Sequence, residues 1–317
     1  MALVAACTGG GQDPGDATAS ASPSATTDVA AGGTDLDGAD ITVGSKDYDE
    51  QLVLSNISTI VLEAAGVNVI DRLDLGGTEA VRSALTGGQI DHYWEYTGIG
   101  WFMHLGKERP PPDPQEQWEQ VRDGELANGV VWLTPAPFNN TYGIAFPRKA
   151  ARRLGRPETL SDLGELVEDE SDTATLCVER EFQSRRDGLP GMEEAYGFEL
   201  PEDNVTTLDL GVVYSALSDR DPCNFGEVFT TDGRIAALDL EVLEDDLGFF
   251  PVYNATPVFT IDVYRQYGRA LEDLFEPVAE ALTQETMIEL NKRLSSDGEL
   301  PEDVARSFLT DNDLLPE

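Results

Sequence analysis

The chain has 317 residues, of which 40% are hydrophobic, so it is long enough for two domains with well-developed cores. Its 60 acidic and 21 basic residues give a formal net charge of −39, which excludes nucleic-acid phosphates and anionic membrane surfaces as partners. So many carboxylates beside only four lysines indicate either an ordinary solvated surface or adaptation to high salt, and we favour the second because salt screens self-repulsion.

Residues 1–40 are expected to form a tether outside the folded part. The sequence LVAAC, ending at Cys7, is similar to a bacterial lipobox, in which small residues precede a lipidated cysteine. The charged and long apolar regions that precede such a box are missing here, which implies a late start codon or a trimmed chain. Residues 8–40 are mostly small and polar and cannot bury enough surface to fold. No run of 18 apolar residues occurs, so a lipid on Cys7 would be the only membrane anchor.

From residue 41 the pattern alternates short strands with helices. Strands are expected at 41–43, 67–70 and 90–93, and helices at 50–65 and 78–85. This alternation predicts an α/β fold with a mainly parallel sheet. Ligands of such sheets bind beyond the carboxyl ends of the strands, where Lys46 and residues 95–97 are expected to lie.

A glycine turn and a run of aromatic residues flank the second of these helices. Gly76 and Gly77 can bring backbone N–H groups close to a ligand, with Thr78 expected to cap the helix. The aromatic residues Tyr93 to Trp101 follow the next strand. Together they indicate a small-molecule site with one anionic and one cationic or apolar end. The alternative is that the rings are core and the glycines only turns.

The remainder of the chain predicts a second lobe inserted into the first. After a helix at 115–126 and a strand at 130–133, the segment 138–146 is expected to cross into this lobe, and 249–253 to return. The first lobe would comprise 41–143 and 252–317, and the second 144–251. Within these lobes, further helices are expected at 148–154, 161–167, 211–217, 285–294 and 301–309, and strands at 173–178, 205–208 and 225–229.

Five stretches in order carry a family resemblance: GSKDYDEQ, GGTEAVRSALTGGQIDHYWEYTG, NNTYGIAF, VFTTDGRI and FFPVYNATPV. They resemble the substrate-binding proteins of ABC importers for quaternary ammonium osmoprotectants (glycine betaine, choline, carnitine, proline betaine). The resemblance extends from residue 41 to the C-terminus. It implies a two-lobed periplasmic-binding-protein clamshell, type II-like, with a ligand cleft between the lobes. It also implies an extracytoplasmic, monomeric receptor that works with an ABC permease and ATPase and needs no cofactor or metal.

The resemblance also implies how a ligand is held. A trimethylammonium group has no N–H to donate, so it is bound by the faces of aromatic rings. The family's cage positions match Tyr96, Tyr142 and Tyr253, while Phe229 stands where relatives usually have tyrosine. Any one of these rings could instead be ordinary core.

A betaine also carries a carboxylate, which needs cationic or N–H donors. Arg185 matches the family arginine at this position, and Lys46 is the second cationic candidate. Thr97 and Asn140 are expected to add polar contacts. The alternatives are that the adjacent Arg186 has this role, or that Arg185 is only a surface arginine on an acidic protein. A retained Arg185 favours a zwitterion with a carboxylate over choline.

Cys177 and Cys223 are expected to form a disulfide, with free buried thiols as the alternative. A metal site is disfavoured because only His92 and His104 accompany them. The histidines also lie in no nucleophile motif, which argues against an enzyme on the same fold. A choline or carnitine receptor and a sensory or permease-fused domain remain alternatives.

Overall fold

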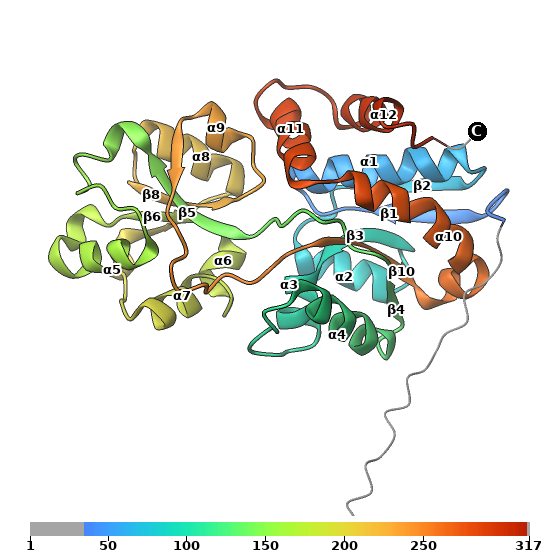
Figure 1. The fold of residues 1–317 in the computed structure, drawn as a ribbon, viewed down its shortest axis with the longest axis horizontal. Helices are drawn as coiled ribbons and strands as arrows, with labels where there is room; N and C mark the ends of the chain where they lie inside the picture. Colours follow the sequence, from blue (N-terminus) through green and yellow to red (C-terminus); the bar gives the residue numbers. More distant parts are fainter. Residues whose placement is uncertain (1–34, 316–317) are drawn as a thin grey trace, which may run out of the picture.

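The computed structural model describes residues 35–315, which form two five-stranded sheets (Figure 1). Cys7 lies outside the described residues. The first sheet, whose strands belong to the first lobe, has the order β2 (Asn68–Arg72), β1 (Asp40–Gly44), β3 (His92–Tyr96), β10 (Ala255–Thr260), β4 (Val130–Trp132). The second sheet, in the second lobe, has the order β7 (Val205–Thr207), β6 (Leu176–Val178), β8 (Phe225–Phe229), β5 (Tyr142–Pro147), β9 (Leu240–Val242).

Helices cover the sheets of both lobes (Figure 1). The first lobe carries α1 (Asp49–Ala64), α2 (Thr78–Thr86), α3 (Thr97–Ile99), α4 (Pro114–Leu126), α10 (Ile261–Ala281), α11 (Gln284–Ser295) and α12 (Pro301–Asp311). The second carries α5 (Leu160–Asp169), α6 (Arg180–Ser184), α7 (Leu189–Tyr196), α8 (Leu210–Asp219) and α9 (Arg234–Ala237). The predicted α/β clamshell is confirmed. Among residues 35–315, no helix has the length and apolar character needed to cross a membrane.

Each sheet is mainly parallel, as the sequence predicted, but contains one strand that runs against the other four. In the first, β1 is parallel to β2 and β3, whereas β10 is antiparallel to β3 and β4. In the second, β6 is parallel to β7 and β8, whereas β5 is antiparallel to β8 and β9. The antiparallel strands are the two that follow the crossings. Because the chain arrives at the carboxyl ends of the parallel strands, it can only run back in the opposite direction.

Two adjacent segments connect the lobes. Residues 133–141 lead from β4 to β5, and residues 243–254 lead from β9 to β10. Asn139 and Asn254 form an antiparallel bridge, and the Asn140 backbone N–H donates to the Tyr253 carbonyl at 3.1 Å. Figure 1 shows both segments running between the two lobes. The bridge joins them into one hinge. The predicted boundaries at 143/144 and 251/252 stay a prediction, with β5 beginning at Tyr142.

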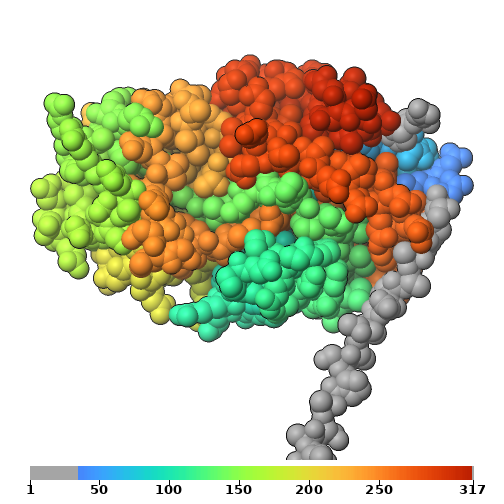
Figure 2. Space-filling view, viewed as in Figure 1, coloured from blue at the N-terminus to red at the C-terminus, as the bar shows by residue number. Residues whose placement is uncertain are grey.

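The lobes also touch away from the hinge. Gly233, just before α9 of the second lobe, lies against α11 of the first, where an added Cβ would be 2.4 Å from the Lys292 Cα. Figure 2 shows the red atoms of the C-terminal helices against the orange atoms of the second lobe on this face. The molecule is therefore in a closed arrangement.

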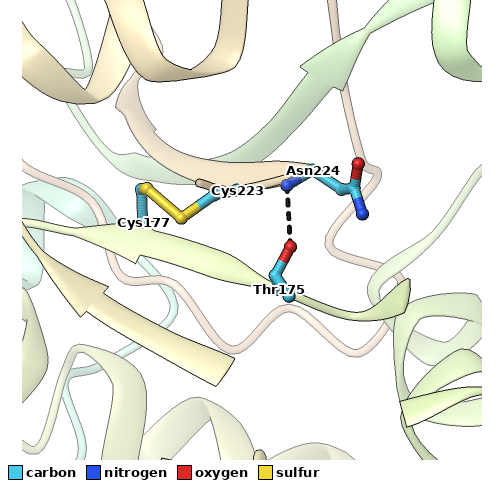
Figure 3. Close-up of a disulfide and its surroundings, with 4 residues drawn as sticks. All are labelled: Thr175, Cys177, Cys223 and Asn224. Atoms are coloured by element: carbon cyan, nitrogen blue, oxygen red, sulfur yellow. Dashed lines mark hydrogen bonds between the residues drawn. A yellow bond between two sulfur atoms is a disulfide. The ribbon is translucent and has the colours of Figure 1, made fainter. Parts of the chain in front are cut away.

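A disulfide joins Cys177 of β6 to Cys223, just before β8, as the sequence predicted (Figure 3). Both residues are buried. Beside the disulfide, the Asn224 backbone N–H donates to the Thr175 hydroxyl at 2.9 Å (Figure 3). These two links tie the start of β8 to β6 and thereby support the strand that ends at Phe229.

Candidate ligand-binding site

A cavity of about 740 Å³ lies between the two lobes. Its walls come from the ends of β1 and β3, the start of α2, the hinge, and the second lobe around α6, α8 and β8. The parallel strands of both sheets point their carboxyl ends at it. This is the position that the α/β pattern predicted for a ligand.

Five aromatic side chains line the cavity: Tyr48, Tyr96, Tyr142, Phe229 and Tyr253. The Tyr142 ring centroid lies 5.5 Å from that of Tyr253, edge to face, and 5.4 Å from that of Phe229. The Tyr48 centroid, from the first lobe, lies 5.6 Å from that of Phe229, from the second. Rings from both lobes and the hinge therefore surround one space, and their faces can attract a cation that has no N–H.

The four predicted cage residues are thus brought together, and Tyr48 is added to them. Tyr48 precedes α1 in the stretch GSKDYDEQ, in which the sequence pointed only to Lys46. A large aromatic residue just after a strand that ends at the cavity was the signal that could have found it.

Glu50 is fully buried behind these rings and receives four hydrogen bonds. The Tyr96 hydroxyl donates to one carboxylate oxygen at 2.7 Å and the Asn140 side-chain amide at 2.8 Å. The Thr231 hydroxyl donates to the other oxygen at 2.6 Å and the Asn291 amide at 2.7 Å. Burial raises the pKa of Glu50 and these hydrogen bonds oppose that rise. One carboxylate therefore joins a cage residue, the hinge, α11 and the second lobe.

The cationic candidates are already paired with carboxylates. The Lys46 ammonium lines the cavity but lies 2.6 Å from a Glu95 oxygen. Burial works against ionisation of Glu95, yet Lys46 and His104 hold its pKa well below the usual range. Arg185 is buried outside the cavity lining, where its guanidinium binds both oxygens of Asp187, one of them at 2.9 Å.

Arg185 and Asp187 support two cage rings. The Arg185 guanidinium carbon lies 5.8 Å from the centroid of the Tyr142 ring, and the Tyr253 hydroxyl donates to Asp187. The sequence placed Arg185 at the ligand and did not identify Asp187 at all. In the structure the pair positions Tyr142 and Tyr253.

The two polar candidates have different surroundings. Thr97 lies outside the cavity lining, and its hydroxyl donates to the Val252 carbonyl at 3.2 Å and accepts from the Asn254 N–H at 3.1 Å. Asn140 does line the cavity. Its side-chain oxygen is buried and has no hydrogen-bond partner among residues 35–315. Thr97 therefore fixes the hinge, whereas Asn140 binds Glu50 through its amide nitrogen.

Glu181 of α6 reaches across from the second lobe to the start of α2. One of its oxygens accepts the Thr78 N–H at 2.9 Å, and the other accepts the Thr78 hydroxyl at 3.0 Å. Thr78 was expected to cap this helix itself. Instead Gly77 is the N-cap residue, and the carboxylate of Glu181 satisfies the helix N–H.

Another buried carboxylate, Glu227, lies on β8 two residues before Phe229. One oxygen accepts the Glu179 backbone N–H at 2.7 Å, and the other has no partner among the described residues. Burial raises the pKa of Glu227 to about 8. At neutral pH this side chain is therefore mostly protonated in the folded protein.

The raised pKa of Glu227 predicts a pH dependence of stability. The folded state holds this proton up to about pH 8, whereas the unfolded chain releases it near pH 4.5, so the free energy of unfolding should fall as the pH rises between these values. A pKa that differs by one between the folded and unfolded states corresponds to about 1.4 kcal/mol. In Glu227→Gln the free energy of unfolding should fall less between pH 4.5 and 9 than in the wild type, by at least about 1.4 kcal/mol. Urea unfolding at a series of pH values measures this. A decline as steep as that of the wild type would contradict the assignment.

Comparison with known proteins agrees with this architecture. Residues 39–311 match the family model described as the substrate binding domain of ABC-type glycine betaine transport systems. A glycine-betaine-binding protein of Pseudomonas aeruginosa is 35% identical over 280 residues, covering 86% of this chain and 88% of the relative. The glycine betaine-binding protein YehZ of Escherichia coli is 36% identical over 276 residues, covering 85% and 89%.

The solved structure of apo YehZ from Escherichia coli is also similar, with a TM-score of 0.63 and 33% sequence identity. The match covers 87% of this chain and 99% of the solved chain. The family inferred from the five sequence stretches is therefore confirmed. The chain belongs to the family of substrate-binding domains of ABC-type glycine betaine transport systems.

Proposed function

We propose that this protein captures a quaternary ammonium solute in the cavity between its lobes and delivers it to an ABC permease and ATPase. The observation that carries the proposal is the ring of five aromatic side chains, contributed by both lobes and the hinge. Each ring face contributes roughly 0.5–2 kcal/mol to a bound cation, so several together give useful affinity. The lobes would close over the cation, and the closed form would be presented to the permease.

Calorimetric titration of the purified protein tests this proposal. Glycine betaine, choline, carnitine and proline betaine would each be titrated at low and high salt, and at least one should bind. Tyr142→Ala removes a ring that contacts two other cage residues and should weaken that binding by about tenfold. Tyr142→Phe keeps the ring and should stay within about threefold of the wild type. Absence of binding, or equal binding by Tyr142→Ala, would overturn the proposal.

Three further statements belong to the same proposal. The family consists of transport receptors, and we infer that this member also acts without catalysis, so the ligand should be recovered unchanged. Receptors of ABC importers act outside the cytoplasmic membrane, and we infer anchoring through a lipid on Cys7, which Cys7→Ser should abolish. We infer a monomer, which light scattering of the ligand-bound protein would test.

A further inference from the structure

Glu181 fills the place in the cavity wall where a ligand carboxylate would find its best donors. Its two oxygens take the first N–H and the hydroxyl of the nine-residue helix α2, at the positive end of the helix dipole. Its second oxygen also lies 3.4 Å from the Arg185 guanidinium. The anion-binding position inferred from the glycine turn thus exists, and the protein's own carboxylate occupies it.

Gly77 makes room for this arrangement. A Cβ at Gly77 would lie 2.5 Å from the Glu181 carboxylate oxygen, which is closer than real Cβ contacts come. The φ angle of Gly77 is −72°, which other residues also adopt, so backbone conformation does not require the glycine. A side chain at Gly77 would therefore displace the Glu181 carboxylate from this position, and glycine lets the carboxylate stay there.

The charges around the cavity also favour a cation and disfavour a second carboxylate. Lys46 is neutralised by Glu95, and the lining residue Arg234 by Asp232 at 2.6 Å. Arg180, exposed at the rim, is the lining cation that forms no ion pair within residues 35–315. Six acidic residues share the same walls: Asp47, Asp49, Asp74, Glu179, Glu181, Asp209. A zwitterion would have to bring its own carboxylate into this negative surrounding.

We propose that the cleft is specific for a quaternary ammonium ligand that carries no carboxylate, and that Glu181 is the residue that excludes the carboxylate. This inference rests on the proposed function, because the aromatic rings hold the ammonium group. Choline is a ligand of this class. Glycine betaine has the same trimethylammonium group with a carboxylate in place of the hydroxymethyl group, so the two form a matched pair of probes.

Titration of the full chain with both probes tests the proposal. The wild type should bind choline at least tenfold more tightly than glycine betaine. Glu181→Ala empties the anion position and should raise the affinity for glycine betaine relative to that for choline by tenfold or more. Glu181→Gln keeps the space filled but removes the charge, and should shift the ratio of the two affinities in the same direction. Asp209→Asn is the control, because it removes one charge from the cavity wall without touching α2.

The outcomes separate this inference from the proposed function. Equal or tighter binding of glycine betaine by the wild type would overturn the inference and leave the aromatic cage intact. If Glu181→Ala and Asp209→Asn shift the ratio of the affinities for glycine betaine and choline equally, Glu181 has no specific role in excluding the carboxylate. Failure of every quaternary ammonium probe would overturn the proposed function and the inference with it.

Discussion

Glu50→Ala is expected to lower the free energy of unfolding by about 3 kcal/mol and to weaken ligand binding by about 100-fold. Four buried donors converge on this carboxylate. In the variant Tyr96, Asn140 and Thr231 lose their acceptor, whereas the Asn291 amide still donates to the Thr231 carbonyl at 3.0 Å. A buried polar group left without a partner costs about 1–3 kcal/mol, partly offset here by relief of the cost of burying the carboxylate. Urea unfolding and calorimetric titration measure the two effects.

The expected loss of affinity follows from the position of the Glu50 partners. Tyr96 and Asn140 line the cavity, while Thr231 belongs to the second lobe, so the variant loosens the site and the closed arrangement together. Glu299→Ala is the control, since Glu299 is exposed and pairs only with Arg293, where a loss below about 1 kcal/mol is expected. Wild-type affinity in Glu50→Ala would contradict the role assigned to this carboxylate.

Much of the fold could be predicted from the sequence because local patterns determine it. The alternation of apolar strands and amphipathic helices indicated the α/β class, and the two crossings were placed where β5 and β10 begin. Strand direction could not be read from that pattern, so the antiparallel strands were missed. The predicted helix at 148–154 is only a three-residue 3-10 turn, Arg148–Ala150, and the chain then reverses at Gly155 and Arg156 with positive φ.

The sequence likewise predicted one part of the candidate site, the aromatic rings, and missed another, the partners of the charged groups. Its rings could be placed because each lies in a stretch that matches the family, and the structure brings all four to one cavity; their contact with a ligand stays a prediction. The partner of Lys46 could not be placed from the sequence, because Glu95 lies 49 residues away. The contacts between the lobes are more distant still, since Glu181 meets Thr78 across 103 residues and Thr231 meets Glu50 across 181. Asp187 lies only two residues from Arg185, but that spacing alone does not show that the carboxylate turns back onto the guanidinium.

Gly98→Ala is expected to weaken ligand binding by about 100-fold while the secondary structure is retained. Gly98 follows Tyr96 and Thr97, and a Cβ there would lie 2.3–2.7 Å from three atoms of the Tyr253 ring. Its backbone lies in the short helix α3, where alanine is more favourable than glycine, so the obstacle is the Tyr253 ring rather than the backbone conformation. Tyr253 cannot yield easily, because its hydroxyl donates to Asp187 and its ring packs edge to face with that of Tyr142. Titration and circular dichroism measure binding and fold.

The Tyr253 ring should also account for the loss of stability in Gly98→Ala. Overpacking of this kind costs about 1–3 kcal/mol, and the cost should disappear when the ring is absent. A double-mutant cycle with Tyr253→Ala tests this, because the variant removes the ring and leaves the Gly98 backbone unchanged. If Gly98→Ala lowers the free energy of unfolding equally in both backgrounds, the clash is not with Tyr253. If the cost disappears, glycine is required at position 98 because a cage ring rests directly on its backbone.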